Sequence, residues 1–151
     1  FVLTMQALNL PQYPFRMSEK NGKTYIFDTL RKKQLVLTPE EWVRQHFVQF
    51  LIQEKGYAAS LIAIEKGLKY NTIQNRADIV IYNKQGEPYM IVECKRPTVK
   101  ITQDTFDQVA RYNMAFKVEL LVVTNGMQHF CCQMNYNDNS YAYLETIPNF
   151  K

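Results

Sequence analysis

The sequence lacks the features of a secreted, membrane-spanning or metal-thiolate protein. No run approaches the ~18 consecutive apolar residues of a membrane helix, and the first residues have neither the basic start nor the length of a signal peptide. The 3 cysteines have no C-x-x-C spacing, and Cys131 and Cys132 are adjacent in a predicted strand, so their side chains face opposite ways. These absences argue against a thiolate zinc site and favour a reduced, cytoplasmic setting.

The chain also has no internal repeat, no low-complexity segment and no linker rich in proline, glycine or serine. Its 151 residues, 46% hydrophobic and 21% charged, fit one globular domain over residues 1–151. We expect Met5 to be the native start, residues 1–4 to be an artificial addition, and residues 1–10 to be partly disordered. The net charge of +4 is compatible with a polyanionic partner without establishing one.

Hydrophobic periodicity and turn residues predict an α/β domain with a single mixed β-sheet flanked by helices. Thr38 is a helix N-cap, and Glu41 three residues later completes a capping box. A helical crossover then leads from the antiparallel middle of the sheet to a parallel neighbour. The expected elements are a hairpin over 13–28 with its turn at Asn21-Gly22, a strand over 31–38, a helix over 38–56, strands over 61–65, 77–82 and 88–95, a helix over 101–117, a buried strand over 118–126 and a hairpin over 129–147.

The most informative stretch is MIVECKRP, residues 90–97, an apolar strand that ends in charged residues. Glu93 and Lys95 share one face of an extended chain, and an exposed ion pair at a strand end is the ordinary explanation. Folding the hairpin about its midpoint, between Gln85 and Gly86, places Asp78 directly opposite Glu93. Because like charges in such a pair are destabilising, the sequence predicts a cation site there, provided that no bulge shifts the register.

The available ligands at this predicted site are carboxylate oxygens and main-chain carbonyls. Cys94 would contribute only its carbonyl, since its thiol points to the opposite face. Both histidines, His46 and His129, are far away in the sequence. Oxygen ligands favour Mg²⁺ or Mn²⁺, which suit phosphate chemistry, and Lys95 could orient an attacking water or neutralise developing charge.

Asp78, fourteen intervening residues and then Glu93-Cys94-Lys95 resemble the D…(D/E)-x-K core of the PD-(D/E)XK nuclease superfamily. The ordered set TPEEWVRQ, RADIVIY, VECKRP, QVARY and VTNG, over roughly residues 30–130, resembles the N-terminal nuclease domain of the restriction (R) subunit of type I restriction enzymes. This resemblance implies a restriction-endonuclease-like fold, Mg²⁺-dependent DNA hydrolysis, and DNA and other restriction-system subunits as partners.

The resemblance also implies roles for individual residues. Asp78 and Glu93 would be metal ligands and Lys95 the catalytic lysine, while the first helix would supply another acidic residue. Glu40 and Glu41 both remain open for that role, and we favour Glu40 because Glu41 has a capping role. Further candidates are Gln108 and Tyr112, which match a Q-x-x-x-Y element, Glu65 at a strand end, and Arg76, Arg96, Lys100, Arg111 and Tyr112 for contacts with DNA.

One feature of full R subunits is missing, because the chain contains no G-x-x-x-x-G-K-[ST] loop and has no room for an ATP-driven motor. It therefore cannot translocate DNA by itself, and is either a stand-alone protein or a module that needs partners. Two alternatives to a nuclease remain open. One is a non-catalytic module that binds nucleic acid or protein on the same fold, and the other is a structural domain with an incidental Glu93–Lys95 pair.

Overall fold

The computed structural model describes residues 5–70 and 73–151, apart from the side chains of residues 65–76, 112 and 115. The expectation for residues 1–4 lies outside this range. The elements are β1 (Met17–Lys20), β2 (Lys23–Asp28), β3 (Lys33–Val36), α1 (Pro39–Gln53), a 3-10 turn (Ala59–Leu61), β4 (Ile62–Tyr70), β5 (Ile73–Tyr82), β6 (Pro88–Cys94), α2 (Gln103–Asn113), a second 3-10 turn (Met114–Phe116), β7 (Leu120–Thr124), β8 (His129–Asn135) and β9 (Ser140–Leu144).

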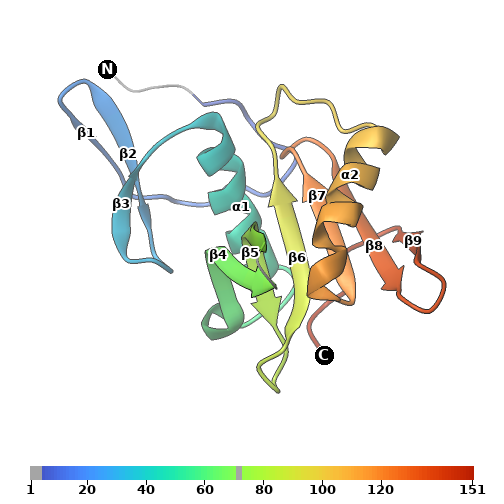
Figure 1. Cartoon of the computed structure of the whole chain (residues 1–151). Helices are drawn as coiled ribbons and strands as arrows, with labels where there is room; N and C mark the ends of the chain where they lie inside the picture. Colours follow the sequence, from blue (N-terminus) through green and yellow to red (C-terminus); the bar gives the residue numbers. More distant parts are fainter. Residues whose placement is uncertain (1–4, 71–72) are drawn as a thin grey trace.

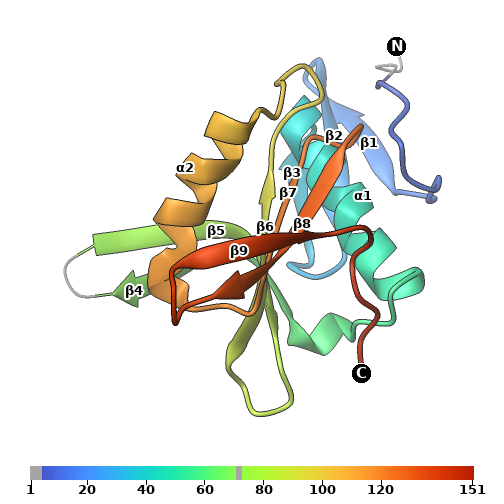
Figure 2. The ribbon, with the colours of Figure 1, turned by 90° about the vertical axis from the view of Figure 1, so that its right-hand side faces the viewer.

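A six-stranded mixed sheet in the order β4-β5-β6-β7-β8-β9 forms the centre of the molecule. Its β6–β7 pair is parallel and the other pairs are antiparallel, as predicted. Helix α2 covers one face of the sheet and α1 the other, so the domain has three layers (Figure 2). Strands β1, β2 and β3 form a separate antiparallel sheet beside α1 (Figure 1), with the predicted Asn21-Gly22 turn at positive φ.

Both faces of the central sheet are buried by helix side chains. On the α1 face, Val43, Phe47 and Leu51 pack in one cluster with residues of β5, β6 and β7. On the α2 face, Phe106 and Val109 pack in a second cluster. Strand β7 is buried along its whole length, as its continuous apolar run predicted. The sheet thus gives β5 and β6 a rigid frame.

Several element boundaries differ from the sequence prediction. Strands β4 and β5 pair with each other over 62–70 and 73–82, where we expected strands only over 61–65 and 77–82. The second helix ends at Asn113 instead of continuing to Lys117, which adopts a left-handed conformation with φ 51°. Helix α1 ends at Gln53, three residues before the expected stop. Cross-strand pairing and local turns decided these ends, and neither follows from hydrophobic periodicity.

Residues 5–10, part of the segment expected to be partly disordered, make several contacts with the rest of the domain. The Trp42 indole donates a hydrogen bond to the Gln6 carbonyl, and the Asn9 N–H bonds the Gly126 carbonyl at 2.9 Å. Leu8 packs against the α1-side cluster and lies over Gly126. This segment is therefore tied to both α1 and the turn after β7. Among the described residues, no helix is long and apolar enough to cross a membrane.

Candidate active site

The register of the β5–β6 hairpin brings the predicted acidic pair together. Tyr82 pairs with Pro88 beside the turn, but a one-residue bulge follows, so that Ile81 pairs with Met90 and Ile79 with Val92. Continuing this register by one residue sets Asp78 opposite Glu93. The structure thus contains a bulge, and the pairing beyond the bulge is the one predicted from the hairpin midpoint.

Asp78 is held in place by the neighbouring strand, because the Cys94 N–H donates to its Oδ2 at 2.8 Å. Burial, followed by the negative charge of Asp78 and a hydrogen bond to it, raises the pKa of Glu93 to about 8. Lys95 acts in the opposite direction and lowers this pKa, while Glu40 adds a smaller increase. These mutual effects show that Glu40, Asp78, Glu93 and Lys95 lie within one electrostatic neighbourhood.

The end of β7 supports the chain around Lys95. The Lys95 N–H donates to the Thr124 carbonyl at 2.8 Å, and the Asn125 side chain donates to the Val99 carbonyl at 2.9 Å. The Asn125 carboxamide oxygen also accepts the N–H groups of Met127 and Gln128, which closes the turn. The VTNG motif therefore fixes the loop that follows the candidate catalytic lysine.

Arg44 on α1 is a member of the site that the sequence analysis missed. Its Nη2 lies 2.8 Å from Glu40 Oε1 and 3.1 Å from Asp78 Oδ1, and its Nη1 lies 2.6 Å from Glu41 Oε1. Burial opposes its charge, but Glu41 and then Asp78 more than compensate and raise the pKa of Arg44. Arg44 follows Glu40 by four residues and Glu41 by three, and this helical spacing was the available signal.

The two acidic residues at the start of α1 have different environments. The Glu41 N–H bonds Thr38 Oγ1 at 3.0 Å, as the capping box predicts, but its carboxylate turns inward. There it accepts bonds from Arg31, Arg44 and Gln45, and its side chain is only 8% exposed. Glu40 is 47% exposed and remains accessible to a ligand. The geometry therefore favours Glu40 over Glu41 as the helix-borne acidic residue of the site.

The donor set at this site fits a hard divalent cation. It comprises the carboxylates of Asp78, Glu93 and Glu40, while the Cys94 thiol lies buried in the α1-side cluster and the Cys94 carbonyl stays a predicted ligand. Within the described part of the chain, no three or more His, Cys, Asp or Glu side chains are grouped to enclose a metal ion by themselves. Mg²⁺ does not need such a cage, because it commonly keeps several waters and uses one or two carboxylates.

Comparison with known proteins identifies the family. The chain matches, over residues 39–148, the family described as "Type I restriction enzyme R protein N terminus (HSDR_N)". The chain belongs to this family. The match includes α1, the β5–β6 hairpin and α2, and thus every residue of the candidate site. A search of curated proteins found no match.

A solved structure supports the HSDR_N fold. It is described as "The fragment structure of a putative HsdR subunit of a type I restriction enzyme from Vibrio vulnificus YJ016", and it aligns with a TM-score of 0.52 at 20% identity. The alignment covers 75% of this chain and 24% of that one. The chain therefore spans about a quarter of the length of this structure.

Four of the remaining predicted residues of this HSDR_N domain lie at its surface. Gln108 on α2 is exposed, as are Arg96, Lys100 and Arg111. Among the described contacts, none links Gln108 with the acidic pair, so its role stays a prediction. The side chains of Glu65, Arg76 and Tyr112 lie outside the described residues.

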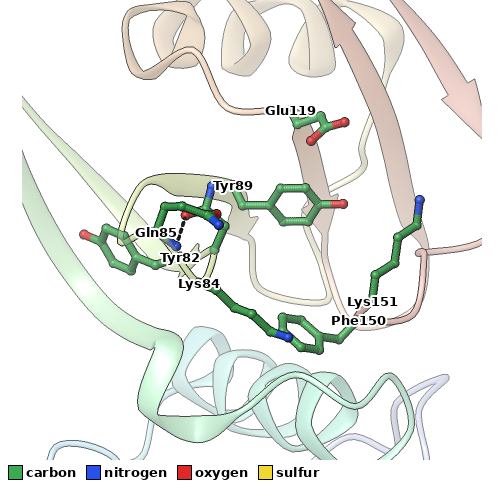
Figure 3. Close-up of a pocket in the computed structure, with 8 residues that line it drawn as sticks. Tyr82, Lys84, Gln85, Tyr89, Glu119, Phe150 and Lys151 are labelled. Atoms are coloured by element: carbon green, nitrogen blue, oxygen red, sulfur yellow. Dashed lines mark hydrogen bonds between the residues drawn. The ribbon is translucent and has the colours of Figure 1, made fainter.

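A hollow of the HSDR_N domain lies at the other end of the β5–β6 hairpin, beside its turn. Its volume is about 250 Å³, and Figure 3 shows Tyr82, Tyr89, Glu119 and Phe150 around it. The turn residue Asn83 accepts the Gln85 N–H at 2.9 Å, which shapes one wall. This hollow does not include the acidic pair, which lies where the β5–β6 pairing ends, with Asp78 in the middle of β5 and Glu93 near the end of β6.

Proposed function

We propose that this domain is a Mg²⁺-dependent endodeoxyribonuclease that hydrolyses phosphodiester bonds in DNA, with Mn²⁺ as a possible substitute. One observation carries the proposal: Asp78, Glu93 and Lys95 come together where the pairing of β5 with β6 ends, and burial followed by the negative charge of Asp78 raises the pKa of Glu93 to about 8. Such a strongly perturbed carboxyl group beside a lysine is typical of functional sites. The HSDR_N family and the R-subunit neighbour add to this support.

Each residue of the proposed site has a task that its position allows. Asp78, fixed by the Cys94 N–H, and Glu93 would hold the cation, with Glu40 and the Cys94 carbonyl as further ligands. A bound Mg²⁺ would polarise the phosphoryl oxygen and make a water more nucleophilic. Lys95 would orient that water or neutralise charge on the phosphate in the transition state. The exposed Arg96, Lys100 and Arg111 would contact the DNA backbone.

The first experiment compares Lys95→Ala with Lys100→Ala in a Mg²⁺-dependent plasmid cleavage assay. Lys95→Ala should abolish cleavage, because the ligands and the lysine act as a unit. Lys100→Ala is the matched control, since it removes an exposed lysine from the same loop region and should only weaken DNA binding. Cleavage by pure Lys95→Ala at the wild-type rate would show that the assigned mechanism is wrong.

The second candidate function is a non-catalytic DNA- or protein-binding module. The observation that favours it is the Arg44 guanidinium between Glu40 and Asp78, since ion pairs of this kind also occur in purely structural networks. Crystals soaked in Mn²⁺ distinguish the two functions. Anomalous density between Asp78 and Glu93 supports the nuclease, whereas DNA binding without metal density or cleavage supports the binding module.

A further inference from the structure

Arg44 occupies a position that joins acidic groups from two separate elements. Its Nη2 contacts Glu40 Oε1 of α1 and Asp78 Oδ1 of β5, at 2.8 and 3.1 Å. The Arg44 side chain is 5% exposed, so these contacts are made in a largely water-excluded environment. A single cationic nitrogen thus bridges two of the oxygens that we assign to the cation site.

A chain of further ion pairs, which begins at Glu41, holds the Arg44 guanidinium in place. Glu41 Oε1 accepts Arg44 Nη1 at 2.6 Å, and Glu41 Oε2 accepts Arg31 Nη2 at 3.2 Å. Arg31 in turn bonds the buried Asp28 at 2.6 Å. Because Glu41 is held on both sides, Arg44 can lose its contacts with Glu40 and Asp78 and still retain a buried anionic partner.

The positive charge of Arg44 offsets the repulsion among the carboxylates most when no metal ion is bound. Asp78 and Glu93 lie opposite each other, one residue beyond the Ile79–Val92 pair of β5 and β6, so their negative charges repel. Glu40 is a third acidic group, since it contacts the same Arg44 nitrogen as Asp78. A buried positive charge between Glu40 and Asp78 relieves repulsion that a divalent cation would otherwise relieve.

We propose that Arg44 is a built-in counterion: it holds Glu40 and Asp78 together in the metal-free protein and releases them when a divalent cation binds. The inference rests on the proposed metal-dependent function and names a residue that regulates the same centre. Arg44 is a positioning residue, since it acts through the two carboxylates and not on the DNA. Its charge and the incoming cation compete for the same oxygens.

The competition between Arg44 and the cation predicts whether removal of the arginine charge strengthens or weakens Mn²⁺ binding. Arg44→Met keeps much of the side-chain length but removes the positive charge, so Mn²⁺ should bind about tenfold or more tightly, because like charges a few ångströms apart repel strongly at a partly buried site. If Arg44 instead served only to orient the ligands, its removal would weaken metal binding, as loss of an orienting partner usually does. The two roles therefore predict opposite changes in the affinity for Mn²⁺.

The test is isothermal titration calorimetry of Mn²⁺ into wild type, Arg44→Met, Arg44→Lys and Arg31→Met, each checked for folding by circular dichroism. Arg31→Met is the matched control, because Arg31 bonds the other carboxylate oxygen of Glu41, at 3.2 Å, and also bonds Asp28. We expect tighter binding for Arg44→Met alone, with Arg44→Lys and Arg31→Met near wild type. Unchanged or weaker binding by Arg44→Met overturns the inference.

A measurement on the wild type covers the case in which Arg44→Met does not fold. A crystal structure with Mn²⁺ should show Nη2 beyond hydrogen-bond distance from Glu40 and Asp78, while Nη1 stays on Glu41. Retention of all three contacts with the ion bound overturns the inference and leaves the metal centre intact. Absence of Mn²⁺ binding in wild type and in every folded variant instead overturns the metal-dependent function itself, and the counterion role with it.

Discussion

The two helices that cover the central sheet bury very different surfaces. Helix α2 is amphipathic: it buries Phe106, Val109 and Ala110, with Asn113 as its buried polar residue. Helix α1 buries an apolar stripe too, but it also buries four polar or charged side chains, namely Glu41, Arg44, Gln45 and His46. Most of the buried charge of the described residues thus lies on one side of the sheet.

This difference indicates which helix carries the chemistry. Buried charges are costly unless they are paired, so a helix that only had to cover a sheet would resemble α2. The charges of α1 form a chain that ends at Asp78, through Arg44. We infer that α1 shapes the acidic site, whereas α2 mainly completes the core and offers an exposed face. The predictions below test this asymmetry.

The largest expected effect is on stability, from Glu41→Ala on α1. The change leaves Arg31 and Arg44 without their shared buried partner, and loss of one member of a buried ion pair typically costs about 3–5 kcal/mol. The matched change on α2 is Asp104→Ala, which removes an exposed acidic residue from the first turn and should cost less than about 1 kcal/mol. Urea unfolding of both variants measures the difference, and similar losses would contradict the asymmetry.

The second prediction concerns the pH dependence of stability in EDTA. The pKa of Glu93 is about 8 in the folded protein against an ordinary value of 4.5, so the folded state binds the proton more tightly. Stability from this group is complete below pH 4.5 and is lost as pH rises towards 8, by up to a few kcal/mol. Glu93→Gln should lack this loss and melt at or above the wild-type temperature at pH 8.

Thermal scans at pH 5, 6.5 and 8 test this prediction with the wild type and Glu93→Gln side by side. Mn²⁺ should raise the wild-type melting temperature at pH 8, because it binds the folded site, and should raise that of the variant much less. If Glu93 were instead a structural partner of Lys95, Glu93→Gln would be destabilised in EDTA and metal would change neither melt. That result would favour an incidental ion pair.

The register and the principal elements could be predicted because their signals are local. A hairpin has a midpoint, and the alternation of ADIVIY and MIVEC fixes which residues face the core, so the Asp78–Glu93 pairing followed from sequence. The N-terminus of α1 followed from Thr38 and Pro39 for the same reason.

The rest of the site could not be predicted because it depends on contacts between distant segments. Arg44 has an intrahelical signal towards Glu40 and Glu41, but nothing in the sequence shows that its guanidinium reaches Asp78, 34 positions away. Asp28 ends a predicted strand, and its burial follows only from the packing of the small sheet against α1, where it accepts bonds from Arg31 and Gln45. Charged networks of this kind are visible only after the fold is known.

A third prediction tests how tightly the α1 side is packed at the backbone. Gly126 has φ 86°, and a Cβ there would lie 2.8 Å from Leu8 Cδ2 and 3.0 Å from Val43 Cγ2. We expect Gly126→Ala to lower the unfolding free energy by about 1–2 kcal/mol. Gly86→Ala is the control, since Gly86 has φ 81° with nothing within 4 Å of a Cβ. Equal losses would mean that the contact with α1 contributes nothing.

The smallest expected effect on stability comes from α2, and it is informative because activity should respond differently. Gln108 is exposed, and alanine is a good helix former, so Gln108→Ala should change the unfolding free energy by less than about 0.5 kcal/mol. Cleavage or DNA binding should nevertheless weaken if the Q-x-x-x-Y element faces the substrate.

Gln53→Ala is the matched control for Gln108→Ala, because Gln53 is an exposed glutamine at the end of α1, far along the helix from Glu40. If both variants cleave and bind DNA equally well, Gln108 is an ordinary solvated residue, and α2 contributes to the core alone. If Gln108→Ala unfolds, the residue has a structural role. A selective loss of function with an intact fold would show that α2 also presents a residue to DNA. The two helices would then differ only in the charged side chains that α1 buries.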